Sequence, residues 1–322
     1  MEPTPDTASH SAVAAQPVVR SVSLIMNEAS GSSNKSELRR QIEQAFEERG
    51  VKVHILPLQA AGGIRRVQRL VEHAEGRLAV AGGDGTINAV ASACRRIDRS
   101  LGLVPAGTFN YVARNLGLPT TVPEAVDVIV HGRPTPVPAG DINGHLFLNN
   151  AGLGLYAQII EQREADKNRF GRKRIVAFLS GMRKLMQRHP RYHLSMRVDG
   201  EDLALRTTAV FFGVNALQLE NYNVEAAQCV KQGELAVLSL HLESRWDIAG
   251  AAWASLTGKT EAAQCVDAVC ARSISVRSGR RRFKVALDGE VIHLRPPLRV
   301  RHVAGAIRII MTDRNVDAAR TT

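Results

Sequence analysis

Short apolar runs alternate with longer amphipathic segments over the first third of the chain. Apolar runs with the length of buried strands lie at residues 22–26, 51–56, 78–81 and 101–104. Segments 35–49 and 64–74, between these runs, have the period of helices. Strands that alternate with helices predict a parallel sheet with right-handed crossovers. We therefore expect a Rossmann-like α/β unit over residues 21–138, with ligands at the carboxyl ends of its strands.

The pattern changes where prolines become dense, between residues 132 and 140. Residues 192–198 then alternate strictly, and Asp199-Gly200 turns the chain into residues 203–206, which predicts a hairpin. Further runs typical of strands lie at residues 208–214, 234–241, 273–276, 282–287 and 291–294. We expect a β-sandwich of two packed sheets over residues 139–298. A last strand-like run lies at 298–303 or 306–311.

Both ends of the chain lack a pattern of either kind. Residues 1–20 are rich in Pro, Ser, Thr and Ala and hold almost no large apolar residues, so we expect a disordered tail. Residues 314–322 are expected to form a second tail. No apolar segment resembles a signal peptide, and none approaches the roughly 18 residues of a spanning helix. We therefore expect a cytoplasmic protein.

A glycine-rich turn, Gly-Gly-Asp-Gly-Thr at residues 82–86, follows one of the apolar runs and precedes a helix-compatible run at 87–94. Glycine lets the backbone approach a phosphate because it has no Cβ. The N-terminus of the following helix offers unpaired N–H groups to an anion. The alternative is a turn without a ligand, since many α/β folds need glycine simply to turn. The string is not the P-loop, which needs Gly-x4-Gly-Lys-Ser/Thr.

A second glycine turn lies one strand–helix unit downstream, within residues 103–119. Residues 101–104 read as a strand and residues 105–107 as a turn. Thr108 or Asn110 can cap a helix that runs to Leu116 and ends before Pro119. A capping role alone is the alternative to a ligand contact for these two side chains.

The two strings together resemble the diacylglycerol kinase catalytic-domain family, which includes bacterial lipid kinases and the sphingosine and ceramide kinases. The first family mark stands at residues 82–86, and the second, Gly-Thr-x-Asn-x-x-Ala-x-x-Leu-Gly-Leu-Pro, stands in full at 107–119. NAD kinases and phosphofructokinases share only the first. A looser resemblance extends over most of residues 21–312. It implies a nucleotide-binding domain of the NAD kinase/diacylglycerol kinase type, completed by residues 299–313.

The resemblance also implies an activity and a set of site residues. The activity is ATP-dependent transfer of a phosphoryl group to a hydroxyl of diacylglycerol or a related lipid, with Mg²⁺. The implied nucleotide site comprises Asn27, Ser30, Gly31, Gly82, Gly83, Asp84, Gly85, Thr86, Thr108 and Asn110. Asp84 would also contact Mg²⁺ through the phosphates. Two other functions stay open: a kinase of a non-lipid acceptor such as NAD or a sugar, and a non-catalytic nucleotide- or lipid-binding protein.

Two Asp-Gly-Glu strings, at residues 199–201 and 288–290, supply candidate carboxylates. Asp-Gly is a strong signal for a type I′ hairpin turn. We interpret the first string as a plain turn, because strictly alternating strands flank it. The residues alone leave the second undecided between a turn and a site. The resemblance assigns Asp288 as the base for the acceptor hydroxyl and Glu290 as its neighbour, which tunes charge or touches Mg²⁺.

The chain departs from the family pattern at several positions. Ala89 stands where the family has Glu, and residues 215–221 differ from the family's Asn-Gly-x-x-x-Gly-Gly-Gly. Residues 230–235 lack the Asp residues that hold a structural Mg²⁺ in many bacterial members, so we predict no structural metal site there. The changes at 217–221 leave the acceptor open.

Charge points to an anionic partner. The formal net charge is +11, and residues 161–191 hold ten Lys or Arg against three Asp or Glu. A basic amphipathic helix there is typical of membrane-surface binding, although a helix packed on the β unit has the same pattern. We expect peripheral contact with anionic lipid. Only 4% of residues are aromatic, which argues against nucleic acid. A homodimer stays open.

The cysteines form no metal pattern. Cys94, Cys229, Cys265 and Cys270 are not accompanied by the His or Cys pair that a zinc site requires. We expect four reduced, partly buried thiols, in keeping with a cytoplasmic protein.

Overall fold

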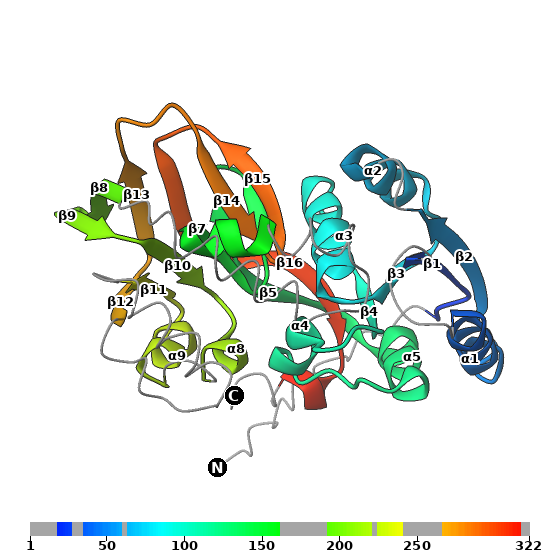
Figure 1. Ribbon diagram of the computed structural model, residues 1–322. Helices are drawn as coiled ribbons and strands as arrows, with labels where there is room; N and C mark the ends of the chain where they lie inside the picture. Colours follow the sequence, from blue (N-terminus) through cyan, green and yellow to red (C-terminus); the bar gives the residue numbers. More distant parts are fainter. Residues whose placement is uncertain are drawn as a thin grey trace, which may run out of the picture.

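The part of the chain that the structure describes folds into one parallel and two antiparallel sheets (Figure 1). The structure, a computed structural model, describes residues 18–27, 35–59, 63–161, 192–220, 224–240 and 266–316. Within these ranges an α/β unit comes first along the chain and a β-sandwich follows. The fold class predicted from the sequence is therefore confirmed.

The parallel sheet has the strand order β2-β1-β3-β4. Its strands are β1 (Ser21–Asn27), β2 (Lys52–Leu58), β3 (Arg77–Gly82) and β4 (Gly102–Pro105). Successive residues of a strand point to opposite faces of the sheet. Leu24 and Ile25, for example, belong to separate buried clusters. Both faces of the sheet are thus buried, which explains why its strands read as continuous apolar runs.

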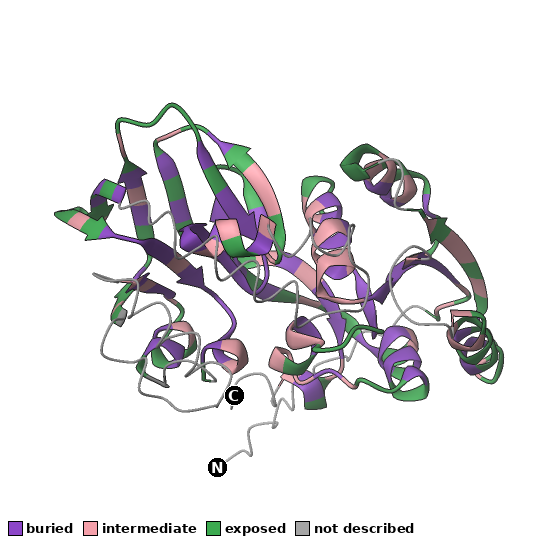
Figure 2. Ribbon diagram, in the orientation of Figure 1, coloured by how far each residue is buried: buried purple, intermediate pink, exposed green. Residues whose placement is uncertain are grey.

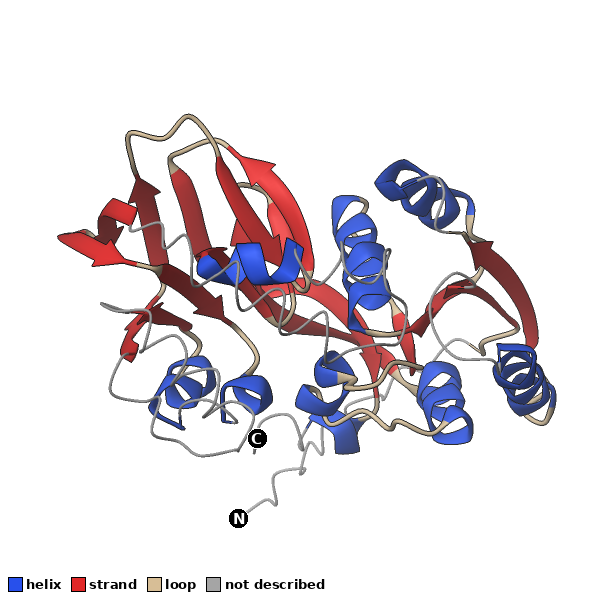
Figure 3. Ribbon diagram, viewed as in Figure 1, coloured by secondary structure: helices blue, strands red, loops and turns tan. Residues whose placement is uncertain are grey.

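Helices cover each face of the parallel sheet (Figure 3). They are α1 (Lys35–Glu47), α2 (Gly63–His73), α3 (Asp84–Arg96), α4 (Tyr111–Asn115) and α5 (Val122–His131). Phe46 of α1 and Ile129 of α5 are buried in the cluster on one face. Val71 of α2 and Val90 of α3 are buried in the cluster on the other. Figure 2 shows the buried residues on the strands and inner helix faces, with exposed residues on the outer faces.

The β-sandwich consists of two six-stranded sheets with a shared core. One sheet contains, in order, β12 (Val266–Ala271), β11 (Leu235–Leu240), β10 (Ala209–Gly213), β7 (Asn150–Gly154), β14 (Phe283–Leu287) and β15 (Glu290–Leu294). The other contains β6 (His145–Phe147), β5 (Arg133–Ile142), β16 (Leu298–Met311), β13 (Ser273–Arg277), β8 (Tyr192–Val198) and β9 (Glu201–Thr207). Phe147, Phe212 and Val276 are fully buried in this core.

Strands β5 and β16 connect the two units. β16 spans both of the last strand-like runs as one strand, with an irregularity between Val303 and Ile307 where Gly305 has a φ of 62°. Ile309 forms a parallel bridge with Leu101, which directly precedes β4. β5 crosses the predicted boundary at residue 138 without a break. The boundary itself stays a prediction.

The prolines of β5 fit its place in the sheet. Proline cannot donate a hydrogen bond to a neighbouring strand, so it is tolerated where that side of its own strand is unpaired. Pro134, Pro136 and Pro138 are exposed, and β6 pairs only with residues 140–142 of β5. The other side of this proline-rich stretch pairs with β16. A pattern that suggested a break in the chain is therefore compatible with a ten-residue strand.

The prediction of four reduced thiols is wrong for two of them. Cys229, on α9 (Val224–Lys231), is joined by a disulfide to Cys270 on β12, with their Cα atoms 5.1 Å apart. The sequence does not reveal this pair, because packing of α9 against β12 brings together residues that are 41 positions apart. Cys94 is free and buried, and burial raises its pKa to about 12. Cys265 lies outside the described residues.

Two membrane-related expectations concern different parts of the chain. No helix within the described residues is both long enough and apolar enough to span a bilayer. The predicted basic amphipathic segment, apart from Glu161, lies outside the described residues.

The two glycine turns meet backbone to backbone at the carboxyl edge of the parallel sheet. Ala106 N donates to Gly82 O at 2.9 Å. A Cβ added to Gly107 would lie 2.7 Å from the Gly83 Cα, which is closer than real side chains come. Because the atom that it would meet belongs to the backbone, it cannot rotate away. Close approach therefore requires glycine at Gly107.

This contact predicts unequal effects of two alanine substitutions. We expect Gly107→Ala to lower the free energy of unfolding by about 1–3 kcal/mol, the usual effect of overpacking. Gly85→Ala should leave it unchanged or raise it, because a Cβ there meets nothing within 4 Å and alanine favours the helix. Urea titrations followed by circular dichroism measure both. Wild-type stability of Gly107→Ala would contradict the contact.

Candidate active site

The predicted nucleotide residues of the first glycine turn lie where β3 passes into α3. Gly83 is the N-cap residue of α3, in extended backbone, and no side chain of the described residues caps it. The first N–H groups of α3 are thus directed at any anion placed there. Asn27, at the end of β1, donates from Nδ2 to Thr86 Oγ1 at 2.8 Å. Ser30 and Gly31 lie outside the described residues.

Asp84 joins the first glycine turn to the second. Its Oδ1 accepts the N–H of Val112 at 2.9 Å, and its Oδ2 accepts that of Tyr111 at 3.2 Å. The Asp84 carboxylate therefore caps α4 from 27 residues upstream. The structure thus brings Asn27, Asp84 and Thr86 to one edge of the sheet, next to the second turn.

The prediction that Thr108 or Asn110 supplies the cap of α4 needs correction. Asn110 does occupy the N-cap position, but its side chain makes no capping hydrogen bond. Its backbone is left-handed, with a φ of 51°, and its Oδ1 accepts the N–H of Gly107 at 2.8 Å. Asn110 therefore shapes the second glycine turn, while Thr108 is exposed on it. Contact of either residue with a nucleotide stays a prediction.

Asp288 is held by three consecutive peptide N–H groups where the turn after β6 enters β7. Its Oδ2 accepts the N–H of Leu148 at 2.7 Å. Its Oδ1 accepts those of Asn149 and Asn150, at 2.9 and 2.8 Å. In return, Asp288 N donates to Asn150 O at 2.9 Å. These bonds fix the carboxylate in one orientation.

The environment of Asp288 raises the pKa of its carboxyl. Burial raises the pKa of its carboxyl to about 6, although the three N–H groups act in the other direction. The charge of Asp84 also raises this pKa. Like charges interact in this way only when they are near each other. Asp84 is therefore close enough to influence the ionisation of Asp288, although the two residues are 204 positions apart in the sequence.

Comparison with Asp199 shows what is special about Asp288. Both aspartates begin an Asp-Gly turn with positive φ at both residues, as a type I′ hairpin requires. Asp199 also accepts N–H groups of a neighbouring segment, from Arg272 and Ser273. Burial raises its pKa, but these hydrogen bonds outweigh that effect, so the pKa is lowered. Two turns of the same geometry thus hold carboxylates whose pKa values shift in opposite directions, and a carboxylate with a raised pKa is a candidate for a functional site.

Glu290 occupies a different environment from Asp288. It is exposed on the first residue of β15, opposite Leu287 of β14. Its role stays a prediction. Ala89, which replaces the family's glutamate, is a half-buried part of the core around α3. Asp84, rather than Glu290, is the carboxylate whose charge raises the pKa of Asp288.

Sequence reasoning missed three buried asparagines around Asp288. Asn149 and Asn150 lie in the turn that holds the carboxylate, and Asn215 directly precedes α8 (Ala216–Glu220). Asn215 donates from Nδ2 to Asn149 Oδ1 at 2.7 Å. The asparagines themselves were a signal of polar contacts, because Asn is rarely buried without a polar partner. The sequence could not assign a role to these asparagines, because their partners come from distant segments.

The described residues fit a cation that arrives with phosphates. Asn88 Oδ1, one helical turn after Asp84 on α3, is buried and has no hydrogen-bond partner within the described part of the chain. Carboxylate and amide oxygens are the ligands that Mg²⁺ prefers. No cluster of three His, Cys, Asp or Glu in the described ranges forms a cage for a metal. The oxygens of Asp84 and Asn88 would thus need phosphate oxygens to complete a Mg²⁺ shell.

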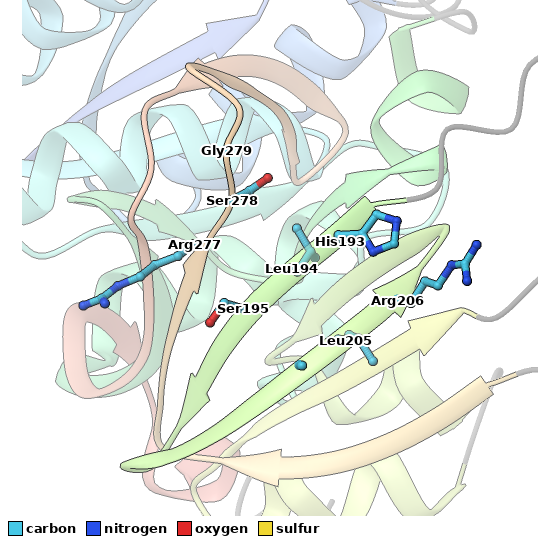
Figure 4. Close-up of a pocket in the computed structure, with 9 residues that line it drawn as sticks. His193, Leu194, Ser195, Leu205, Arg206, Arg277, Ser278 and Gly279 are labelled. Carbon is cyan, nitrogen blue, oxygen red and sulfur yellow. The ribbon is translucent and has the colours of Figure 1, made fainter.

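A separate groove lies on the sheet of the β-sandwich that contains β8 and β9. Its volume is about 530 Å³, and β8, β9 and the segment after β13 line it. Figure 4 shows Arg206 and Arg277 on its opposite sides. It contains none of the predicted site residues, so it plays no part in the arrangement around Asp288.

Comparison with known proteins gives the family. Residues 21–142 match the family described as the diacylglycerol kinase catalytic domain. The diacylglycerol kinase of Bacillus subtilis is 33% identical over 140 residues, which cover 42% of this chain and 46% of that protein. An uncharacterised Synechocystis protein is 26% identical over 200 residues, or 58% of this chain and 45% of that protein. The chain matches less than half the length of these curated relatives.

A solved structure agrees over nearly the whole chain. The crystal structure of a putative diacylglycerol kinase from Bacillus anthracis covers 94% of this chain, with a TM-score of 0.68 and 22% identity. The match extends over 99% of that structure, which shows that the two-part fold is shared. Residues 21–142 of this chain, which contain both glycine turns, belong to the diacylglycerol kinase catalytic-domain family.

Proposed function

We propose that this protein is an ATP-dependent lipid kinase that phosphorylates a hydroxyl of diacylglycerol or a related lipid. The observation that carries the proposal is the half-buried Asp288 carboxylate, which is held by three peptide N–H groups and has a pKa raised to about 6. A general base works best when its pKa lies near the operating pH. Family membership supports the use of ATP.

The nucleotide phosphates would bind at the N-terminus of α3. Its first N–H groups and the Thr86 hydroxyl are donors, and Asn27 fixes the position of Thr86 Oγ1. Mg²⁺, when bound with ATP, neutralises the charge that develops on the phosphates. Asp84 and Asn88 would hold it from the protein side, because they carry a carboxylate and an amide oxygen one helical turn apart on α3, the latter without a hydrogen-bond partner among the described residues. Asp84 keeps lone pairs for this contact, since a carboxylate accepts about four hydrogen bonds.

The transfer itself needs a base on the side of the acceptor. Asp288 Oδ2 accepts one of the three N–H bonds and Oδ1 accepts two, so Oδ2 has more capacity for a proton. As Oδ2 takes the proton of the acceptor hydroxyl, the hydroxyl oxygen forms a bond to the γ-phosphorus. The bond from that phosphorus to the bridging oxygen breaks, and ADP leaves with the electron pair.

The acceptor lipid would be met at an anionic membrane surface. The net charge of +11 favours such contact. Within the described residues, Arg280, Arg281 and Arg282 are exposed between β13 and β14, and the Arg280 guanidinium lies 4.4 Å from the centre of the Tyr192 ring. The assay must therefore present the lipid in vesicles that contain anionic lipid.

Substitution of the two matched aspartates tests the proposal. We expect Asp288→Asn to lower kcat by about 10²–10⁴-fold, the usual contribution of a general base, with nucleotide affinity retained. Asp199→Asn makes the same change in the same type of turn and should leave kcat within about twofold. Transfer of label from ATP to diacylglycerol in vesicles measures kcat.

Other outcomes of this assay would point elsewhere. Wild-type activity of Asp288→Asn would remove Asp288 as the base. Labelling of NAD or a sugar, with no labelling of any lipid, would indicate a different kinase class. Nucleotide binding without transfer to any acceptor would indicate a non-catalytic protein.

The raised pKa of Asp288 predicts a pH profile. The base works only when ionised, so kcat/KM should rise with pH and level off above about pH 6. An unperturbed aspartate, with a pKa of about 3.9, would already be ionised at pH 5. Initial rates between about pH 5 and about pH 8 distinguish the two cases. A flat profile over this range contradicts a perturbed base.

A further inference from the structure

Asn215 bridges the two halves of the candidate active site. It is completely buried, at 0% exposure. Its Nδ2 donates to Tyr111 O at 3.1 Å and to Asn149 Oδ1 at 2.7 Å. Its Oδ1 accepts the N–H of Gln218 at 2.9 Å. One side chain thus contacts α4, the turn before β7 and α8.

Both partners of the Nδ2 atom are residues that hold a carboxylate. The N–H of Tyr111 donates to Asp84, and the N–H of Asn149 donates to Asp288. A continuous chain of contacts therefore runs from Asp84 through Tyr111, Asn215 and Asn149 to Asp288. Val214 N donates to Asn149 O at 2.9 Å, which fixes the same turn a second time.

Further bonds hold the segment that carries Asn215. Asn150 donates from Nδ2 to Gln218 Oε1 at 2.8 Å, and the Tyr156 hydroxyl donates to Asn150 Oδ1 at 2.7 Å. Leu217 N donates to Asn115 Oδ1 at 3.3 Å, at the end of α4. α8 is thus fixed to α4 on one side and to β7 on the other. Its place depends on both halves of the site.

Among side chains of this size, only that of asparagine can pair with all of the hydrogen-bonding groups around position 215. The two groups that face Nδ2 are acceptors, a carbonyl and an amide oxygen, and the group that faces Oδ1 is a donor. A flipped amide would bring oxygens against oxygens, so its orientation follows from the hydrogen bonds. Aspartate has no donor, and alanine or leucine would leave the buried partners unpaired.

We infer that Asn215 is a positioning residue that couples the nucleotide turn to the base Asp288. By holding α4 and Asn149 at a fixed separation, it sets where the Asp288 carboxylate meets the phosphate bound at α3. The inference rests on the proposed function, which gives Asp288 the role of the base. Asn215 itself touches neither carboxylate, so it acts only through Tyr111 and Asn149.

Loss of the amide should misplace the base without removing it. We expect Asn215→Ala to lower kcat by about 10²-fold, the usual effect of a displacement of about 1 Å. The affinity for a non-hydrolysable ATP analogue with Mg²⁺ should change by less than about fivefold, because the donors of α3 remain. The hydrogen bond from Asn149 N to Asp288 should weaken, so Asp288 should titrate at higher pH than in the wild type.

Thr207→Val is a matched control for the loss of buried hydrogen bonds. The buried Thr207 hydroxyl shares its one hydrogen between Ala209 O and Leu240 O, each 2.8 Å away, within the β-sandwich. Ala209 lies on β10 and pairs with Gly154 of β7. Gly154 is at the opposite end of β7 from Asn150, so this hydroxyl is remote from the turn that holds Asp288. We expect this variant to unfold at lower denaturant concentration than the wild type but to keep its kcat and the titration of Asp288.

The experiment combines kinetics with a titration that needs no substrate. Carbon-13 NMR of Asp-labelled protein follows the Asp288 carboxyl, identified by its absence from Asp288→Asn. A lower kcat together with a higher titration midpoint in Asn215→Ala supports the coupling. A lower kcat with an unchanged midpoint means a purely structural role and overturns it, as does an unchanged kcat.

Failure of the proposed function gives a different result. If the wild-type protein phosphorylates no lipid, the proposed function fails, and the NMR midpoint alone judges the coupling: a shift keeps it and no shift overturns it. If Asn215→Ala does not fold, Asn215→Ser, which keeps one donor, is measured in the same way. Its smaller side chain cannot reach both acceptors, so a shift of the same sign is expected.

Discussion

Three consecutive peptide N–H groups, those of Leu148, Asn149 and Asn150, hold the Asp288 carboxylate near the carboxylate of Asp84. This arrangement is electrostatically unfavourable, because burial and a like charge both oppose ionisation of Asp288. The peptide groups offset part of the cost, and the pKa settles at about 6. The result is a base that is ionised near neutral pH and can still take a proton.

The rest of the fold serves to bring these two carboxylates together. Asp84 stands at the junction of two glycine turns whose backbones touch, and it ties α3 to α4 through its capping bonds. Asp288 stands on the β14–β15 hairpin, whose strand β14 pairs with β7. α3 contacts β6 and β16, so the core of the parallel sheet continues into the β-sandwich. The two units thus share a buried cluster, and Asn215 adds a polar bridge at the site itself.

Local patterns in the sequence predicted the parts of the structure that depend on neighbouring residues. The alternation of apolar runs and helices gave the parallel sheet, and strict alternation gave the hairpin at Asp199. The glycine turn at residues 82–86 was found because glycine has a local steric reason to be there. The two Asp-Gly-Glu strings could not be told apart in this way, because both form the same turn and differ only in what faces them.

The predictions were missing or wrong for features that depend on partners far along the chain. The cap of α4 comes from Asp84 rather than from Asn110, and Cys229 pairs with a cysteine on another strand. β5 tolerates its prolines because of an open sheet edge that only the tertiary structure creates. The buried asparagines around Asp288 belong to the same class, since each is explained by a partner far along the chain. The family resemblance, rather than residue physics, singled out Asp288.

The proximity of Asp84 and Asp288 is the central claim, and the titration of Asp288 in an Asp84→Asn variant tests it most directly. Carbon-13 NMR of the labelled carboxyl would follow this titration in the protein without nucleotide. The wild type should titrate at about pH 6, and the variant at lower pH because the like charge is gone. A wild-type midpoint near that of a free aspartate, or a midpoint that Asp84→Asn does not change, would contradict the account.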